Sequence, residues 1–414
     1  MKTKLWEKET KTDKLIEHFT VGKDRELDMK IAPYDVIASK AHAKMLSKVG
    51  LITNEESEQL IKVLEEIGVL LSKDQFKIEE GVEDIHSQIE FYLTKKLGET
   101  GKKIHTARSR NDQVLTAIKL YLKNELKEIE GLSKELQKIF YSLSKEHKLK
   151  LMPGYTHFQI AMPSSFGLWF AAYGESLEED IEIIKAAYKI CDKNPLGSGA
   201  GFGSSFSIDR NFTTQEMGFA QLNENSVYAQ MTRGKTEKIV AMALSNVAAT
   251  LSKFSYDVCL YLSQNFGFIS FPEQFTTGSS IMPHKKNPDV FELIRAKCNL
   301  LQGLPNQFTL LTNNLPSGYH RDMQLTKEVL FPAIDTMKDC LQILIHILPS
   351  IEIKNDILQD KKYEYLFSVE EVNKLVIAGK PFREAYQAIA DQIKNGTFTP
   401  DKKIKHTHIG SIGN

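Results

Sequence analysis

The 414-residue chain carries 53 basic and 53 acidic side chains, so its formal net charge is zero. This balance offers no electrostatic footprint for DNA, RNA or an anionic membrane, and we expect a small-molecule ligand instead. No apolar run is long enough for a signal peptide or a membrane span, which predicts a cytoplasmic protein. Neither a disulfide framework nor a zinc spacing is expected, because the four cysteines are widely separated, at Cys191, Cys259, Cys298 and Cys340.

The first 107 residues predict a small helical domain. Helical patterns cover about 34–48 and 53–72, and a turn-rich stretch follows at 73–76. We place the boundary of this N-terminal domain at 1–107.

Residues 108–349 predict a central bundle of long helices. Apolar side chains recur every seven residues from Leu115 to Leu143, which indicates one helix from about 112 to 146. The segment at 235–265 is apolar around most of its circumference and must be covered on all sides, so an obligate oligomer is expected. With the first helix, the bundle has five long helices, the others being at about 164–190, 235–265, 288–312 and 325–348.

The last part of the chain, 350–414, predicts a second small helical domain, with helices at 369–376 and 382–393. The expected fold is therefore all-α, with three domains.

Polar residues concentrate at three places where a helical pattern begins or breaks. The run at 106–113 precedes the first long helix, where it could bind a carboxylate or simply cap the helix through Asn111 or Asp112. Prolines bracket His157, which could exchange a proton near neutral pH or be purely structural. The third run could hold a polar ligand or be a helix start with i,i+4 charge pairs, and it contains Tyr319, Arg321, Gln324 and Lys327.

The segment from Gly278 to Pro288 has the layout of a lid that closes over an anion. A glycine precedes two small hydroxyl residues, Lys285 and Asn287 supply charge and an amide, and Pro288 opens a helix. The segment resembles the signature of the fumarase/aspartase superfamily, Gly-Ser-Ser-x-Met-Pro-x-Lys-x-Asn-Pro, at every fixed position. This resemblance implies a lyase that releases fumarate.

Other segments resemble one branch of that superfamily, the argininosuccinate lyases. The Ser-Arg-Asn-Asp-Gln run at 109–113 is the most specific of them, and the resemblance extends from Pro33-Tyr34-Asp35 to 379–385 in the tail. It implies elimination of fumarate from argininosuccinate, the last step of arginine biosynthesis, with no cofactor and no metal. It also implies a homotetramer with a twenty-helix core and active sites shared between three subunits.

The resemblance also assigns site residues. Ser279 matches the base, with Ser280 as its competitor, while Lys285 and Asn287 match the residues that stabilise the carbanion. His157, paired with Glu292, matches the acid or its support. The implied substrate contacts are His86, Ser109, Arg110, Asn111, Thr156, Tyr319, Gln324 and Lys327.

The chain departs from the family pattern at a few positions, among them Asp24, where a serine is usual, Ala107, Gly234 and His284. We leave the region around Asp24 out of the expected site. Two rival interpretations remain. Adenylosuccinate lyase shares the loop signature, although the run at 109–113 argues against it. A crystallin-like structural homologue without activity is the other, although the retained Ser279, Lys285, His157 and Glu292 argue against it.

Overall fold

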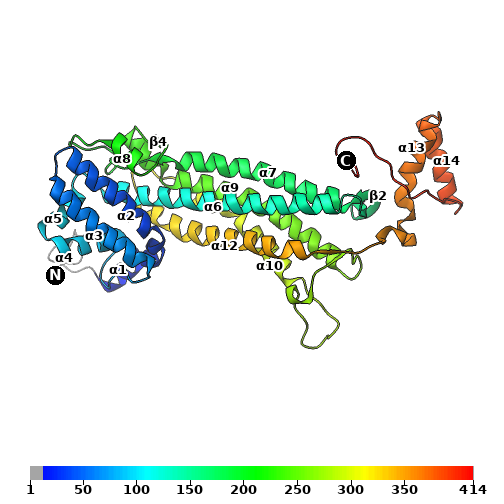
Figure 1. Ribbon diagram of the computed structural model, residues 1–414, viewed down its shortest axis with the longest axis horizontal. Coiled ribbons are helices and arrows are strands. Elements are labelled where there is room, and N and C mark those ends of the chain that lie inside the picture. The colour runs from blue at the N-terminus through cyan, green and yellow to red at the C-terminus, as the bar shows by residue number, and fades with distance from the viewer. Residues whose placement is uncertain (1–12, 414) are drawn as a thin grey trace. The chain divides into compact units, whose positions relative to one another are not determined.

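The protein is described from a computed structural model over residues 13–413. It consists mostly of α-helices with a few short strands (Figure 1), so the expected all-α class is confirmed. Within the described range, no helix combines the length and apolar character needed to cross a bilayer.

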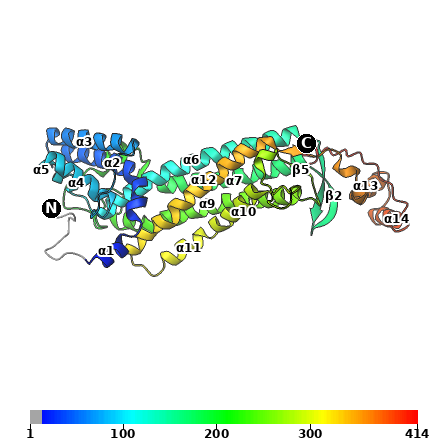
Figure 2. The ribbon, with the colours of Figure 1, turned by 90° about the horizontal axis from the view of Figure 1, so that it is seen from below.

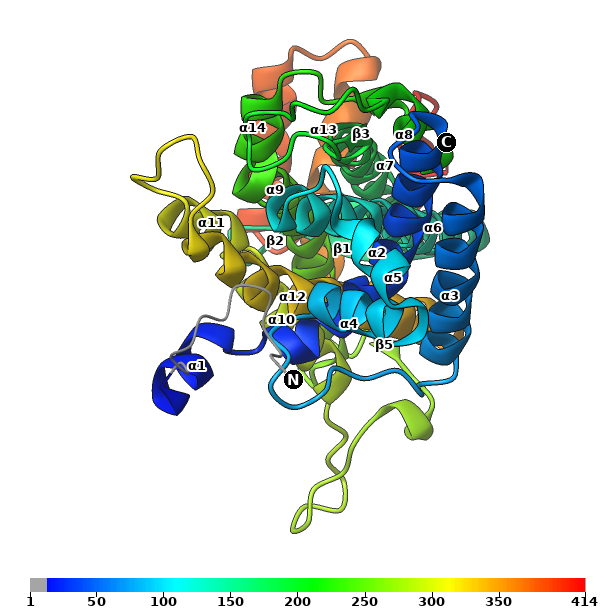
Figure 3. The ribbon, with the colours of Figure 1, turned by 90° about the vertical axis from the view of Figure 1, so that its left-hand side faces the viewer.

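Helices α2 (Asp24–Lys48) and α3 (Asn54–Ser72) pack side by side, with α4 (Ile85–Leu97) and α5 (Glu99–Lys102) against them (Figure 3), and the heaviest contact is between α2 and α3. A reciprocal cap fixes the start of α3, because Thr53 Oγ1 accepts a hydrogen bond from Glu56 N and Glu56 Oε2 accepts one from Thr53 N. The helices predicted at 34–48 and 53–72 correspond to α2 and α3, and α2 starts earlier than predicted. The remaining elements here are α1 (Lys14–Val21) and the 3₁₀ helix η1 (Lys103–His105).

Four of the predicted long helices are confirmed: α6 (Arg110–Glu146), α7 (Phe166–Cys191), α9 (Ser226–Leu262) and α12 (Leu325–Ile347). The heptad leucines of α6 are buried, as the pattern required. Helix α9 begins before its predicted start and bends at Arg233 and Gly234, where Gly234 has φ of 80°. A Cβ on Gly234 would lie 2.8 Å from Met323 Sδ, so glycine suits both the backbone angle and the close approach.

The predicted helix at 288–312 is divided into α10 (Asp289–Leu301) and α11 (Leu304–Leu311), which Figure 2 draws as separate segments. Pro305 lies in the first turn of α11. Proline has no amide hydrogen, so the backbone hydrogen bond to Leu301 that a continuous helix would need cannot form. The prediction of one continuous helix over 288–312 is therefore wrong.

A β-hairpin formed by β1 (Leu151–Thr156) and β2 (Gln159–Ser165) was not anticipated from the sequence. Thr156 pairs with Gln159, which leaves His157 and Phe158 as a two-residue turn, and both have φ of 55°. Two consecutive residues with positive φ match the twist that a tight hairpin requires. Residues other than glycine and asparagine rarely adopt this backbone conformation. The hairpin thus holds His157 at its tip in a conformation with backbone strain.

The C-terminal region contains α13 (Ser368–Ile377) and α14 (Phe382–Lys394), close to their predicted bounds, packed through Val372, Ala385 and Ile389. The other short elements are α8 (Arg210–Glu216), the strand pairs β3 (Lys193–Asn194) with β4 (Gln221–Leu222) and β5 (Ile269–Ser270) with β6 (Glu352–Ile353), and the 3₁₀ helices η2 (Glu273–Phe275), η3 (Arg321–Gln324), η4 (Leu348–Ser350), η5 (Ile357–Gln359) and η6 (Lys361–Phe367).

The chain divides into two compact units, each assembled from segments distant in sequence. Unit 1 comprises residues up to 130 with 182–246 and 300–337. Unit 2 comprises 131–181 and 247–299 with the residues from 338 onward. The three-domain division at 107 and 349 stays a prediction.

Candidate active site

The starts of four helices surround a cavity of about 500 Å³ in unit 1. These helices are α2, α4, α6 and α12, and each contributes the positive end of its dipole at its first turn. Such an arrangement favours bound carboxylates. The side chains lining the cavity include Asp24, Asp28, Asp84, His86, Ser87, Ser109, Arg110, Asn111, Arg233, Tyr319, Arg321, Gln324 and Lys327.

Seven of the predicted substrate contacts line this one cavity: His86, Ser109, Arg110, Asn111, Tyr319, Gln324 and Lys327. They come from three separate stretches of sequence, which unit 1 brings together. The other predicted site residues, Thr156, His157, Ser279, Lys285, Asn287 and Glu292, belong to unit 2.

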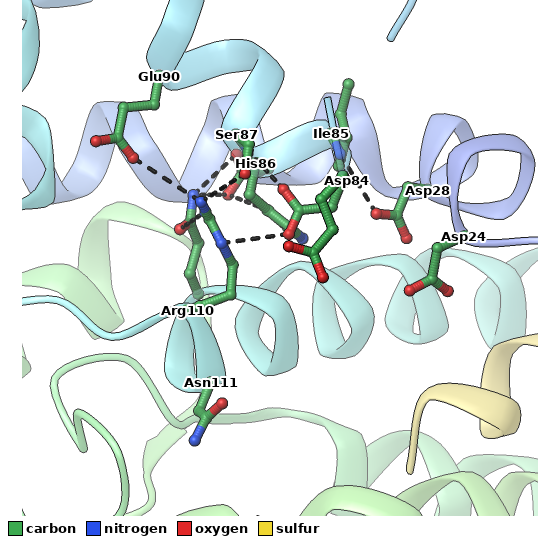
Figure 4. Close-up of polar contacts among 12 residues, drawn as sticks. Asp24, Asp28, Asp84, Ile85, His86, Ser87, Glu90, Arg110 and Asn111 are labelled. Atoms are coloured by element: carbon green, nitrogen blue, oxygen red, sulfur yellow. Dashed lines mark hydrogen bonds and ion pairs between the residues drawn. The ribbon is translucent and has the colours of Figure 1, made fainter. Parts of the chain in front are cut away.

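Arg110 is held by contacts around the start of α4. Its Nε lies 3.3 Å from Asp84 Oδ2, and its Nη2 donates to Ser87 Oγ at 3.1 Å. Asp84 in turn caps α4 by accepting from Ser87 N at 2.6 Å. In Figure 4, Arg110 points into this cluster and the neighbouring Asn111 side chain points away from it. The Asn111 amide is therefore the more available of the two for a ligand.

His86 is buried beside Asp35 from α2. Its Nδ1 lies 3.1 Å from Asp35 Oδ1, and Gln113 Nε2 donates to the same oxygen at 3.0 Å. Burial alone raises the pKa of the Asp35 carboxyl, but the charge and hydrogen bond of His86 and the charge of Arg108 outweigh it and lower the pKa to about 2. Asp35 is therefore ionised at neutral pH and fixes the ring of His86 at the cavity wall.

Lys327 is buried between two carboxylates that the sequence analysis left out of the site. Its Nζ lies 2.8 Å from Asp24 Oδ1 and 2.5 Å from Asp28 Oδ1. Burial lowers the pKa of Lys327, while Asp28 and Asp24 raise it more, so the net shift is upward. The available signal was the i,i+4 spacing of these two acids at the start of α2, which puts both on one helix face.

Asp24 gives a prediction for stability against pH. Burial, with the like charge of Asp28, raises the pKa of Asp24 from 3.8 to about 6 despite the opposing Lys327. The folded protein therefore binds this proton more tightly than the unfolded chain. The resulting stabilisation is complete below about pH 4 and is lost as the pH rises through about 6, by up to about 3 kcal/mol.

We expect Asp24→Asn to remove this pH dependence. The unfolding free energy of the wild type, relative to the variant, should fall between about pH 4 and pH 7 in denaturant titrations. The exposed substitution Glu80→Gln serves as the control. A wild-type-minus-variant difference that stays constant with pH would contradict the assignment.

Arg233 and Tyr319 form a further part of the cavity wall. The Arg233 guanidinium carbon lies 5.7 Å from the Tyr319 ring centroid, and Arg233 Nε lies 3.5 Å from Glu237 Oε1. Arg233 was missed in the sequence because it stands at the bend of α9, where no motif marks it. Arg321, from the third polar run, is instead bound to Glu83 at 2.8 Å.

In unit 2, the 278–288 loop is closed at its neck by backbone hydrogen bonds. Asn287 N donates to Thr277 O at 2.8 Å, and Thr277 N donates to Asn287 O at 3.3 Å. Within the loop, Ser279 Oγ accepts from Met282 N at 3.2 Å and from Ile281 N at 3.4 Å. The serine predicted to act as base thus already faces two amide donors, while Lys285 is exposed.

His157 and Glu292 are both exposed, His157 at the hairpin tip and Glu292 in the first turn of α10. Over residues 13–413 the structure records no hydrogen bond or ion pair between them. Their pairing stays a prediction, as does the contact of Thr156 with substrate.

Comparison with known proteins identifies close relatives. A family model described as "Lyase" matches residues 7–303. The argininosuccinate lyase of Parabacteroides distasonis is 56% identical over 414 residues, which cover 100% of this chain and 93% of the relative. Among solved structures, EDDS lyase in complex with formate aligns with a TM-score of 0.80 at 22% identity, covering 94% of this chain and 78% of that one. A class II fumarase from Schistosoma mansoni aligns with a TM-score of 0.74 at 16% identity, with coverages of 90% and 88%; both structures support the fold alone.

Proposed function

This chain belongs to the argininosuccinate lyase family of the fumarase/aspartase superfamily, and from that premise we propose how it cleaves argininosuccinate to arginine and fumarate. The observation that supports the proposal most directly is the cavity of unit 1, lined by seven side chains of the family's substrate-binding motifs. Argininosuccinate carries three carboxylates, and four helix N-termini with Arg110 and Arg233 suit such an anion.

The chemical step is an elimination across a carbon–carbon bond of the succinyl group. In the proposal, Ser279 Oγ removes a proton from the carbon next to a carboxylate, and the electron pair left behind is delocalised into that carboxylate. The carbon–nitrogen bond then breaks, its electron pair leaves with the guanidinium nitrogen, and a double bond forms to give fumarate. The intermediate has one more negative charge than the substrate, so its stabilisation determines the rate.

Lys285 and Asn287 are assigned to that stabilisation, because a cation and an amide donor strengthen their contacts as charge develops on the carboxylate. Ser279 needs help of the same kind, since a serine hydroxyl is a very weak acid. The two amides that already donate to its oxygen, from Ile281 and Met282, favour the alkoxide. Closure of the loop would exclude water and strengthen these contacts.

The departing nitrogen requires a proton. We assign its delivery to His157, supported by Glu292, because a carboxylate beside an imidazole raises the ring's basicity and fixes its tautomer. The exposed hairpin tip that carries His157 is suited to reach a site completed by another subunit.

We further propose a cytoplasmic homotetramer with each active site shared between three subunits. The cavity of unit 1 is lined by unit 1 residues alone, while the proposed base, lysine and histidine belong to unit 2. The long helices also expose large apolar side chains, among them Met242 at 48%, Leu293 at 60% and Leu300 at 77%, which partner subunits would cover.

The deciding experiment measures fumarate by its ultraviolet absorbance. We expect purified protein to release fumarate from argininosuccinate and not from adenylosuccinate, because the run at 109–113 resembles that of the argininosuccinate lyases and a relative of that name is 56% identical. Release from adenylosuccinate alone would overturn the substrate assignment. A folded tetramer, by light scattering, that releases fumarate from neither compound would favour the crystallin-like structural homologue.

A further inference from the structure

Lys119 on α6 is a buried ammonium group in unit 1 that the proposed reaction does not use. Its side chain is almost fully enclosed, with the residue 1% exposed. Its Nζ donates to Lys193 O at 3.2 Å and to Asn223 Oδ1 at 3.1 Å. Both acceptors are neutral, and an ammonium group has three hydrogens to donate. Among residues 13–413, these two contacts leave one donor of the ammonium group without a hydrogen bond, and neither contact supplies a negative charge.

The next lysine on the same face of α6 has the direct carboxylate partner that Lys119 does not have among the described residues. Lys123, one turn further on, forms an ion pair with Asp192 and donates to Gly218 O at 2.7 Å. For Lys119 the nearby acid is Glu237, whose Oε2 accepts from Gly234 N at 2.7 Å and whose Oε1 lies 3.5 Å from Arg233 Nε. Glu237 attracts Lys119 electrostatically, but Arg233 and the Gly234 amide share that carboxylate and no direct ion pair with Lys119 is formed among the described residues. A buried ammonium group without a direct ion pair is costly, so a further anionic partner would stabilise it.

A cavity of about 150 Å³ lies beside Lys119. Among the described residues that line it, none is an aspartate or glutamate, whereas Lys193 and Lys235 add two further cations. Asn223, Thr232 and Thr236 bring polar groups to the wall. A water molecule takes about 30 Å³ in the liquid, so this volume accommodates an anion of a few heavy atoms but no nucleotide.

We propose that this cavity binds a small inorganic oxyanion, such as phosphate or sulfate, which accepts the remaining hydrogen bond of Lys119 and balances its charge. Lys235 at the exposed rim attracts the anion, and Lys119 at the inner wall holds it. Burial lowers the pKa of Lys119 to about 8, so the group is still charged at neutral pH and gains from a counter-ion. The site does not depend on the proposed activity.

The test compares thermal unfolding in inorganic phosphate and in chloride at matched ionic strength. For the wild type we expect phosphate at about a hundredfold above its Kd to raise the midpoint by about 3 °C. Lys119→Met should lose this increment. Lys123→Met is the matched control, because its partner is Asp192, and it should keep the increment.

A second variant avoids dependence on a single substitution. Asn223→Asp places a carboxylate within hydrogen-bond distance of Lys119 Nζ, with little change in side-chain shape. It should raise the midpoint in chloride and abolish the phosphate increment, since the missing charge is then supplied from within the chain. An equal increment in the wild type, Lys119→Met and Asn223→Asp would locate the anion elsewhere, for example in the active-site cavity, and overturn the proposal. So would the lack of any increment in the wild type.

Discussion

Ser279→Ala is expected to lower kcat by about 10²- to 10⁴-fold and to leave substrate binding nearly unchanged. The substitution removes the oxygen that is proposed to take the proton, while the cavity of unit 1, assigned to most of the substrate contacts, keeps all its groups. Within residues 13–413, Ser279 Oγ is hydrogen-bonded to two backbone amides of its own exposed loop, so the fold should tolerate the change. Fumarate release gives kcat, and calorimetric titration of the variant with argininosuccinate gives Kd.

Ser280→Ala is the matched control. Ser280 is the adjacent, exposed hydroxyl of the same size, and its loss should leave kcat close to that of the wild type. If Ser280→Ala abolished turnover while Ser279→Ala remained active, the two serines would exchange roles. A loss of binding in Ser279→Ala would instead assign the hydroxyl to substrate contact.

The helices were predictable because the periodicity of their apolar residues indicates which helix face is buried. The heptad from Leu115 to Leu143 gave α6 almost to its end residues. The division between α10 and α11 was not predicted, because apolar residues recur at helical spacing on both sides of Gln302 and Gly303. The break comes from Pro305, which cannot donate the backbone hydrogen bond of a continuous helix. The hairpin was missed for a different reason: its turn uses His157 and Phe158 at positive φ, where glycine or asparagine is the usual signal.

The site could be predicted as far as motifs name residues. Ser109, Arg110 and Asn111 precede or open α6, and the structure brings them together with His86 and Lys327, residues far away in the sequence. The ion pairs of Lys327 with Asp24 and Asp28 could not be inferred from sequence spacing alone. Nothing in the local sequence shows that α2 and α12 begin beside the same cavity. Charge pairs across a cavity depend on tertiary structure, whereas helix periodicity is local.

The acids on Lys327 also affect what the cavity can bind. With Asp24 and Asp28 both ionised, Lys327 contributes no net positive charge, so attraction for a carboxylate falls to the helix N-termini, Arg110 and Arg233. Protonation of Asp24, whose pKa is raised by burial to about 6, would restore a neutral cluster around Lys327. The protonation state of Asp24 therefore changes the charge balance of the site.

The proposed sharing of active sites between subunits makes a prediction that a site built from one chain would not satisfy. Asn111→Leu removes a proposed substrate contact in unit 1, and Ser279→Ala removes the proposed base in unit 2. Asn111 points away from the Arg110 cluster, so its replacement should spare the fold (Figure 4). Each variant alone should be nearly inactive.

Co-expression of Asn111→Leu and Ser279→Ala in equal amounts is expected to restore roughly a quarter of wild-type activity per subunit. In randomly mixed tetramers, a site that takes these two residues from different subunits receives both intact in one case out of roughly four. If both residues came from the same subunit, every site would retain one defect and activity would stay at the level of the separate variants. Fumarate release by the mixed tetramers, with the variants mixed only after purification as the control, separates the two architectures.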